Sequence, residues 1–327
     1  MEAENSWSSR CALVTGATGL LGSALIAELL RRGARVTALV RDADPQSELI
    51  RTGTIRHVTV SQGSLEDYAS LERAINENEC DTVFHLGAQT IVGTALRSPL
   101  ATFEANIRGS YNLLEACRVH SKLVKRVLIA SSDKAYGSSD TLPYTEQHPL
   151  VGRHPYDVSK SCTDLLASTY AHTYGLPAGI LRCGNIYGAG DLNWSRLIPG
   201  TIRSLLEGTA PVIRSDGKFL RDYVYVQDVV EAYLLVSDRL EPSMRGESFN
   251  FSPERAFSVL EVVDLLRQIL HRVDLEPIIL SQATAEIRDQ YLDCSKAKRA
   301  LGWSPKFTFQ QGLEQTVHWY QGYLSGK

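Results

Sequence analysis

The sequence predicts an α/β fold, in which a doubly wound parallel sheet is followed by a smaller C-terminal α/β lobe. Two observations predict it: short β-branched runs alternate with helical segments, and a glycine-rich turn follows the first run. The runs cover residues 11–15, 35–40, 57–60, 81–86, 126–130 and 178–182. The stretches between them, such as 22–32 and 103–120, place apolar residues at helical spacing and are expected to cover both faces of the sheet.

The composition favours chemistry on a small molecule. The chain has 327 residues, 43% of them hydrophobic, with a net charge of -3 and no basic block, which argues against nucleic acid and anionic membranes as partners. Its six cysteines form no CxxC pair, which indicates reduced thiols in a cytoplasm and no metal site. The first ten residues are polar, and no run approaches the roughly 18 apolar residues that would span a bilayer.

The first run leads into the turn Gly16-Ala-Thr-Gly-Leu-Leu-Gly22, a GxxGxxG pattern. Glycines at such a turn let backbone N–H groups approach a pyrophosphate and let the following helix pack close to its strand. Because this pattern follows a strand in the first βαβ unit, it predicts dinucleotide binding, and the fold is of the Rossmann type. The second run ends at Arg41-Asp42, which is compatible with NAD and, because of Arg41, with NADP.

The rhythm of the sequence changes after about residue 183 to loops and shorter elements, then to helical patterns at 259–271 and 309–323. We therefore expect a dinucleotide-binding domain over residues 1–182, to which the chain returns around 222–250. Residues 183–327 are expected to form mainly a substrate-binding lobe.

Tyr156 and Lys160 lie four residues apart in a helical segment, so their side chains share one face. The ammonium of Lys160 is expected to favour the phenolate and to bring the pKa of Tyr156 down. A phenol tuned in this way exchanges protons with a substrate.

Five motifs in order give the chain its resemblance to a known family. They are the GxxGxxG turn, His85-Leu-Gly-Ala-Gln89, Ser131-Ser-Asp-Lys-Ala-Tyr-Gly137, the YxxxK pair and Arg182-Cys-Gly-Asn-Ile-Tyr-Gly188. Over nearly its whole length the chain resembles the extended short-chain dehydrogenases/reductases that act on nucleotide sugars. The resemblance implies a cofactor site formed by Gly16, Thr18, Gly19, Leu20, Leu21, Arg41, Ser64, Leu65, Leu86, Ala88, Tyr156 and Lys160.

By the same resemblance, Ser132 binds the sugar hydroxyl at C4 while Tyr156 removes its proton, and hydride passes from C4 to the nicotinamide. The 4-keto sugar is the branch point between 4-epimerases and 4,6-dehydratases. Most 4,6-dehydratases have Asp-Glu after the catalytic hydroxyl, whereas this chain has Asp133-Lys134. CDP-glucose 4,6-dehydratases resemble it in having Asp-Lys there, so we expect a dehydratase with Asp133 as acid and Lys134 as base.

C4 epimerisation with Ser132, Tyr156 and Lys160 stays the alternative, and decarboxylation of a nucleotide-linked uronic acid is a third variation. The resemblance further implies contacts to a nucleotide-diphosphate sugar at Gln89, Asn185, Arg196, Leu197, Arg221 and Arg288. It also implies a homodimer formed through helices around residues 103–120 and 156–174.

Overall fold

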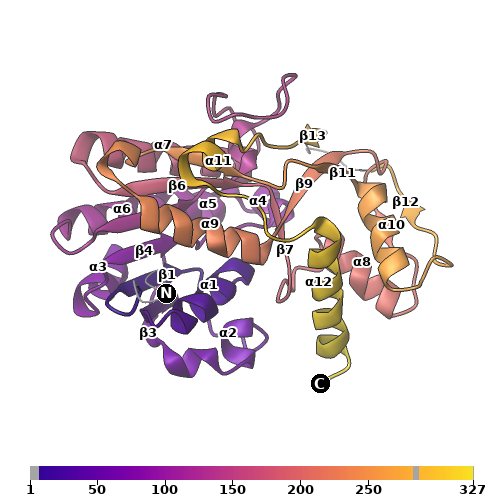
Figure 1. Ribbon diagram of the computed structural model, residues 1–327, viewed down its shortest axis with the longest axis horizontal. Helices are drawn as coiled ribbons and strands as arrows, with labels where there is room; N and C mark the ends of the chain where they lie inside the picture. The colour runs from indigo at the N-terminus through magenta and orange to yellow at the C-terminus, as the bar shows by residue number, and fades with distance from the viewer. Residues whose placement is uncertain (1–6, 283–286, 327) are drawn as a thin grey trace.

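The computed structural model describes residues 7–282 and 287–326 of the chain. A seven-stranded sheet with the order β3-β2-β1-β4-β5-β6-β10 forms its centre, and all its neighbouring strands are parallel (Figure 1). The first six strands follow the 3-2-1-4-5-6 order of doubly wound dinucleotide-binding sheets. The strands are β1 (Cys11–Thr15), β2 (Arg35–Val40), β3 (Thr59–Gln62), β4 (Thr82–His85), β5 (Arg126–Ala130), β6 (Ala178–Cys183) and β10 (Ser248–Phe251).

Helices cover both faces of this sheet, and each face has its own apolar core. One core includes Val14 and the other includes Leu13, because successive side chains of β1 point to opposite faces. The first face packs against α1 (Leu20–Arg31), α9 (Val226–Arg239) and α11 (Ser295–Leu301). The second face packs against α3 (Tyr68–Glu77), α6 (Gly109–Val119) and α7 (Pro155–Tyr174).

A smaller lobe lies beyond one end of the sheet, at the right of Figure 1. It contains a four-stranded sheet of β7 (Asn185–Tyr187), β9 (Leu220–Tyr225), β11 (Ala256–Ser258) and β13 (Asp289–Gln290). A third apolar core joins this sheet to α8 (Leu197–Leu206), α10 (Val259–Ile269) and α12 (Phe309–Leu324). A two-stranded sheet pairs β8 (Val212–Ile213) with β12 (Ile278–Ile279). Strand β10 and helices α9 and α11 come from the C-terminal half of the chain but pack on the large sheet.

Two elements differ from their predicted form. The strand expected at 57–60 begins at Thr59, because Gly53, with φ +76°, starts a 3-10 turn (Thr54–His57) that takes up the preceding residues. The helix expected over 103–120 is α6 preceded by a π-helical turn at Glu104–Arg108. The remaining short helices before α7 are α2 (Glu48–Arg51), α4 (Val92–Arg97), α5 (Pro99–Phe103) and η4 (Asp133–Tyr136). Within the described ranges no helix is long and apolar enough to cross a bilayer.

Candidate active site

The glycine turn between β1 and α1 packs tightly against the end of β4. Gly16 has φ +67°, and a Cβ at Gly16 would lie 2.8 Å from the Cα of Gly87. A Cβ at Gly22 would lie 2.1 Å from the carbonyl oxygen of Gly16. The turn at Thr18 and Gly19 closes on itself, since the Gly19 N–H donates to the carbonyl oxygen of Gly16 at 3.0 Å. No side chain caps α1, so its first residues, Leu20 and Leu21, lie at a positive helix end. This cradle fits the pyrophosphate of a dinucleotide.

The other predicted cofactor residues lie on the same edge of the sheet, after the ends of β2, β3 and β4. The Thr15 hydroxyl accepts hydrogen bonds from the backbone N–H groups of Leu86 at 3.1 Å and Gly87 at 3.0 Å. Leu65 reaches the same loop, since its Cδ1 would lie 3.1 Å from a Cβ at Gly87. Ser64 and Ala88 are the chain neighbours of these residues. The structure therefore brings the loops after β1, β3 and β4 together.

Arg41 lies at the end of β2 and forms an ion pair with Asp42 at 2.6 Å, with both side chains more than half exposed. Its carbonyl oxygen accepts a hydrogen bond from the Gln62 side chain at 2.7 Å. A cavity of about 410 Å³ extends from Arg41 past Glu66 and Gln89 to helices α4 and α5. Arg41 thus lines a cavity that also reaches Gln89 in the loop after β4.

Ser132, Tyr156 and Lys160 lie where β5 ends and α7 begins, with Ser132 and Tyr156 in contact and Lys160 bound to the end of β5. Ser132 caps η4, since its hydroxyl accepts a hydrogen bond from the N–H of Lys134 at 3.2 Å. Tyr156, in the first turn of α7, forms a side-chain hydrogen bond with Ser132. The buried Lys160 ammonium donates to the carbonyl oxygen of Ala130 at 2.7 Å, which fixes α7 against β5.

The pKa values at this pair differ from the expectation. Burial and, secondarily, the Asp133 carboxylate raise the pKa of Tyr156, whereas the Ser132 hydrogen bond and Arg196 lower it. Burial also lowers the pKa of Lys160 to about 8. The predicted lowering of the Tyr156 pKa by Lys160 is therefore wrong for this structure. The physical reason is that burial favours the uncharged form of both groups, and the ammonium is bound to a backbone carbonyl.

Asp133 and Lys134 point into the protein from η4. Asp133 is 2% exposed, and its Oδ1 accepts a hydrogen bond from the Ser132 hydroxyl at 2.8 Å. Its Oδ2 is buried without a hydrogen-bond partner among the described residues. The Lys134 ammonium donates to the side-chain oxygen of Gln290, and burial lowers the pKa of Lys134 while Asp133 raises it. The Ser132 hydroxyl is thus bonded to the Asp133 carboxylate and to the backbone of Lys134, whose ammonium reaches Gln290.

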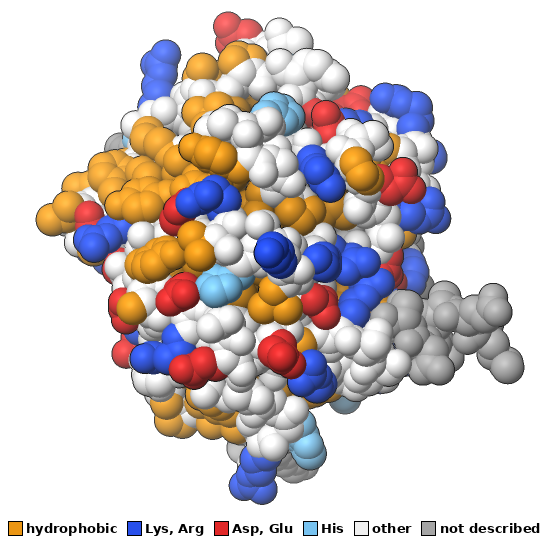
Figure 2. Space-filling model, turned by 90° about the vertical axis from the view of Figure 1, so that its left-hand side faces the viewer, with side chains coloured by type: hydrophobic (Ala, Val, Ile, Leu, Met, Phe, Trp, Pro, Cys, Tyr) orange, Lys and Arg blue, Asp and Glu red, His pale blue; other side chains and the backbone are white. Residues whose placement is uncertain are grey.

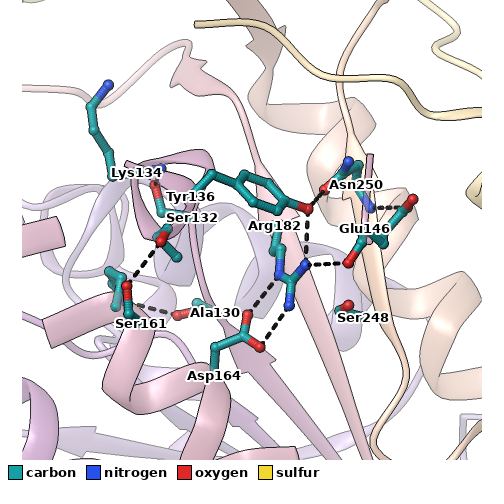
Figure 3. Close-up of polar contacts among 12 residues, drawn as sticks. Ala130, Ser132, Lys134, Tyr136, Glu146, Ser161, Asp164, Arg182, Ser248 and Asn250 are labelled. Atoms are coloured by element: carbon teal, nitrogen blue, oxygen red, sulfur yellow. Dashed lines mark hydrogen bonds and ion pairs between the residues drawn. The ribbon is translucent and has the colours of Figure 1, made fainter. Parts of the chain in front are cut away.

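A buried ion pair holds together the elements around Ser132. Arg182 of β6 donates two hydrogen bonds to the carboxylate of Asp164 on α7, at 2.7 and 2.8 Å (Figure 3). Arg182 also donates to the phenol oxygen of Tyr136 at 2.9 Å, and that phenol donates to Asn250 of β10 at 2.7 Å. The network joins α7, β6 and β10 to η4, which Ser132 caps and which carries Asp133 and Lys134.

Sequence reasoning missed Asn106, which lies in the π-helical turn before α6. Its side-chain oxygen accepts a hydrogen bond from the N–H of Gln89 at 2.7 Å, and its amide nitrogen donates to the Ser159 hydroxyl at 2.9 Å. The Ser159 hydroxyl in turn donates to the carbonyl oxygen of Tyr156 at 2.7 Å. Asn106 thereby links the loop after β4 to the first turn of α7. The sequence carried no distinct signal for it, because polar residues such as Glu104, Arg108 and Asn112 surround Asn106.

Of the predicted substrate residues, Gln89 lies in the loop after β4, and the others lie on the small-lobe side. Arg196 precedes α8 and pairs with Asp191 at 2.9 Å, close enough to Tyr156 to lower its pKa. Leu197 is the first residue of α8, and the Asn185 amide donates to the carbonyl oxygen of Asp222 at 3.1 Å.

The two arginines predicted to bind phosphate, Arg221 and Arg288, have different surroundings. The guanidinium of Arg221 donates to the carbonyl oxygens of Arg288, at 2.6 Å, and of Ile287. The Arg288 side chain itself is exposed. Arg221 therefore contacts the backbone of Arg288 and not its guanidinium.

Comparisons with known proteins agree with this geometry. The family described as GDP-mannose 4,6 dehydratase matches residues 13–316. A dTDP-glucose 4,6-dehydratase of Xanthomonas campestris pv. campestris is 33% identical, with 96% of both chains covered. A CDP-glucose 4,6-dehydratase of Salmonella typhimurium is 30% identical over 99% of this chain and 94% of its own.

Solved structures show the same likeness. A Thermotoga maritima UDP-glucose 4-epimerase with UDP-glucose has a TM-score of 0.87 at 30% identity, covering 96% of this chain and 99% of its own. A Streptomyces venezuelae dTDP-glucose 4,6-dehydratase with NAD bound has the same TM-score at 27% identity, covering 96% and 98%. The chain belongs to the family of nucleotide-sugar dehydratases and epimerases. It is an enzyme of this kind, built on the Rossmann-type sheet that the sequence predicted.

Proposed function

We propose that the protein is a nucleotide-sugar 4,6-dehydratase, which oxidises the sugar at C4, eliminates water across C5 and C6, and reduces C6. The observation that carries the proposal is the order of side chains on η4. Asp133, which is buried, and Lys134, which is half-buried and whose pKa is lowered, follow Ser132 directly. Asp133 lies close enough to Tyr156 to raise its pKa. Oxidation at C4 needs only the serine and the tyrosine, whereas elimination needs a further acid and base.

Each residue then has a role at a stated atom. Ser132 holds the C4 hydroxyl by a hydrogen bond, and Tyr156 accepts its proton. A bound dinucleotide would supply the reversible hydride acceptor for this reaction. Lys134 in its neutral form takes the C5 proton, which the C4 ketone makes acidic. Asp133 protonates the C6 oxygen, which leaves as water. When C6 is reduced, the protonated Lys134 returns a proton to C5 and becomes neutral again, and solvent restores the proton balance between Tyr156 and Asp133.

We propose NAD as the cofactor. The Arg41 guanidinium, which would have to accept a 2′-phosphate, is paired with Asp42, and that carboxylate repels a phosphate. Equilibrium binding should therefore give a lower Kd for NAD than for NADP. Equal affinity for both would contradict this choice.

The second candidate is C4 epimerisation, which the similarity to the UDP-glucose 4-epimerase favours. It would use Ser132, Tyr156 and Lys160 and leave Asp133 and Lys134 without a chemical role. In either reaction the nucleotide diphosphate is proposed to lie against Gln89, Asn185, Arg196 and Leu197, with Arg221 and Arg288 as further ligands.

We also propose a cytoplasmic homodimer. Apolar side chains gather on the left of Figure 2, and those exposed on α5, α6 and α7 include Leu100, Tyr111 and Leu165. A contiguous apolar surface of this kind is typical of a protein–protein interface. The six cysteines are free, which supports a reducing compartment.

The test is incubation with CDP-, UDP-, GDP-, ADP- and dTDP-linked hexoses, followed by mass spectrometry and NMR of the products. Loss of water supports the dehydratase, and an isomer of unchanged mass supports the epimerase. Loss of carbon dioxide from a nucleotide-linked uronic acid alone would contradict both. Asp133→Asn should impair water loss more than the initial oxidation, whereas equal impairment would argue against its acid role.

A further inference from the structure

Lys134 is held by a residue from a distant part of the chain. Its ammonium leaves η4 on the side away from Arg182 (Figure 3) and donates to the side-chain oxygen of Gln290 on β13. Gln290 is fully buried, and its side-chain nitrogen has no hydrogen-bond partner among the residues that the structure describes. Strand β13 pairs with β9, with Gln290 in register with Arg221. The contact therefore joins the cofactor domain to the edge of the small-lobe sheet.

Charged groups face Lys134 from three elements. Asp133 of η4, Asp157 of α7 and Asp222 of β9 raise its pKa, whereas burial, the largest effect, and Arg221 of β9 lower it. Asp222 is itself fully buried, and burial raises its pKa to about 7, so its negative charge is weakened near neutral pH. Gln290 adds a hydrogen-bond acceptor to this set without adding a charge.

The Gln290 side chain carries no charge, and this affects whether Lys134 can act as a base. A neutral amine has two N–H donors and one lone pair, and a lysine side chain is a flexible four-carbon stem. A hydrogen bond from one N–H to a rigidly buried acceptor restricts the amine's rotation and therefore the direction of its lone pair. A carboxylate in the same place would restrict it too, but would stabilise the ammonium and remove the lone pair at neutral pH.

We propose that Gln290 is the positioning residue for Lys134: its side-chain oxygen orients the amine for removal of the C5 proton, and its neutrality keeps that amine available as a base. This inference rests on the proposed dehydratase reaction, because Lys134 has a base role only in elimination. Gln290 itself touches neither C4 nor the proton acceptor Tyr156 in this account.

Two variants separate orientation from charge. Gln290→Met keeps the length of the side chain and removes the acceptor, so water loss should fall about tenfold or more, the effect of one lost hydrogen bond. Formation of reduced cofactor in a single turnover should keep its wild-type rate. Gln290→Glu keeps an acceptor and should raise the pKa of Lys134 by about 1–3, moving the rising limb of the pH–rate profile to higher pH. Gln315→Glu, which adds the same charge on α12, is the control and should leave that limb in place.

The Lys134 pKa is also read without turnover, from the 15N NMR titration of lysine side-chain nitrogens in the full-length protein, with Lys134→Arg to assign the signal. Both variants should melt cooperatively, so that lost activity is not lost folding. The inference is overturned if Gln290→Glu leaves the Lys134 pKa unchanged, or if Gln290→Met slows cofactor reduction and water loss equally. Failure of the proposed function is a different outcome, because wild-type protein would then convert nucleotide hexoses without releasing water.

Discussion

Replacement of Asp164 by alanine tests how far the buried ion pair behind the site supports the fold. Asp164 and Arg182 are 2% and 5% exposed, and two hydrogen bonds join them at 2.7 and 2.8 Å. Removing one partner of a buried pair leaves an uncompensated charge and costs about 3–5 kcal/mol. Arg182 keeps its hydrogen bond to Tyr136, which places the expected loss near 3 kcal/mol. That is a large fraction of the roughly 5–15 kcal/mol that stabilises a folded domain.

Urea unfolding followed by circular dichroism measures this loss. With a slope of about 3 kcal/mol per molar urea, the midpoint should fall by about 1 M. The control is Asp274→Ala, which breaks the ion pair between Asp274 and Arg272 at 3.4 Å. Because the Asp274 side chain is 66% exposed, this substitution should lower the free energy of unfolding by at most about 1 kcal/mol. The double variant Asp164→Leu, Arg182→Leu should be more stable than Asp164→Ala, because no buried charge is left alone. Equal midpoints for Asp164→Ala and Asp274→Ala would refute the reasoning.

Three further predictions follow from single positions. Gly16→Ala should weaken NAD binding about tenfold or more in calorimetry, because its Cβ would meet Gly87, whereas Gly53→Ala, also at positive φ but with nothing within 4 Å, should bind normally. If both bind NAD alike, the cradle is misassigned. Asp222→Asn should flatten the pH dependence of the free energy of unfolding. Burial raises the pKa of Asp222 to about 7, so protonated Asp222 stabilises the fold fully below about pH 4, and this stabilisation is lost as the pH rises to about 7. Urea midpoints across that range measure it, and an unchanged slope would count against this assignment. Leu165→Glu, at a position 56% exposed on α7, should give monomers in analytical ultracentrifugation, and a persistent dimer would place the interface elsewhere.

The sequence was informative wherever structure depends on local pattern. Buried strands rich in apolar and β-branched residues, such as 11–15 and 35–40, were predicted with their observed ends. The edge strand β3 was displaced, because its side chains are mostly exposed and carry little apolar signal. The glycine turn was predicted because the residues that its geometry requires are close together in the sequence.

Long-range contacts escaped prediction for a physical reason. Gln290 lies on a two-residue strand and meets Lys134 across 156 positions of sequence, so no periodicity marks it. Asn106 depends on a π-helical turn, which has no compositional signature distinct from the surrounding helix. The Tyr156 pKa also depends on burial, a property of the whole fold, rather than on the spacing to Lys160.

The most direct test of the proposed reaction is the product mass when the enzyme acts on nucleotide-linked glucose in D2O. We expect loss of one water and gain of one deuteron at C5, because the proton that Lys134 removes exchanges with solvent while the C4 hydride is carried internally to C6. A product of unchanged mass without deuterium would contradict it and identify C4 epimerisation instead.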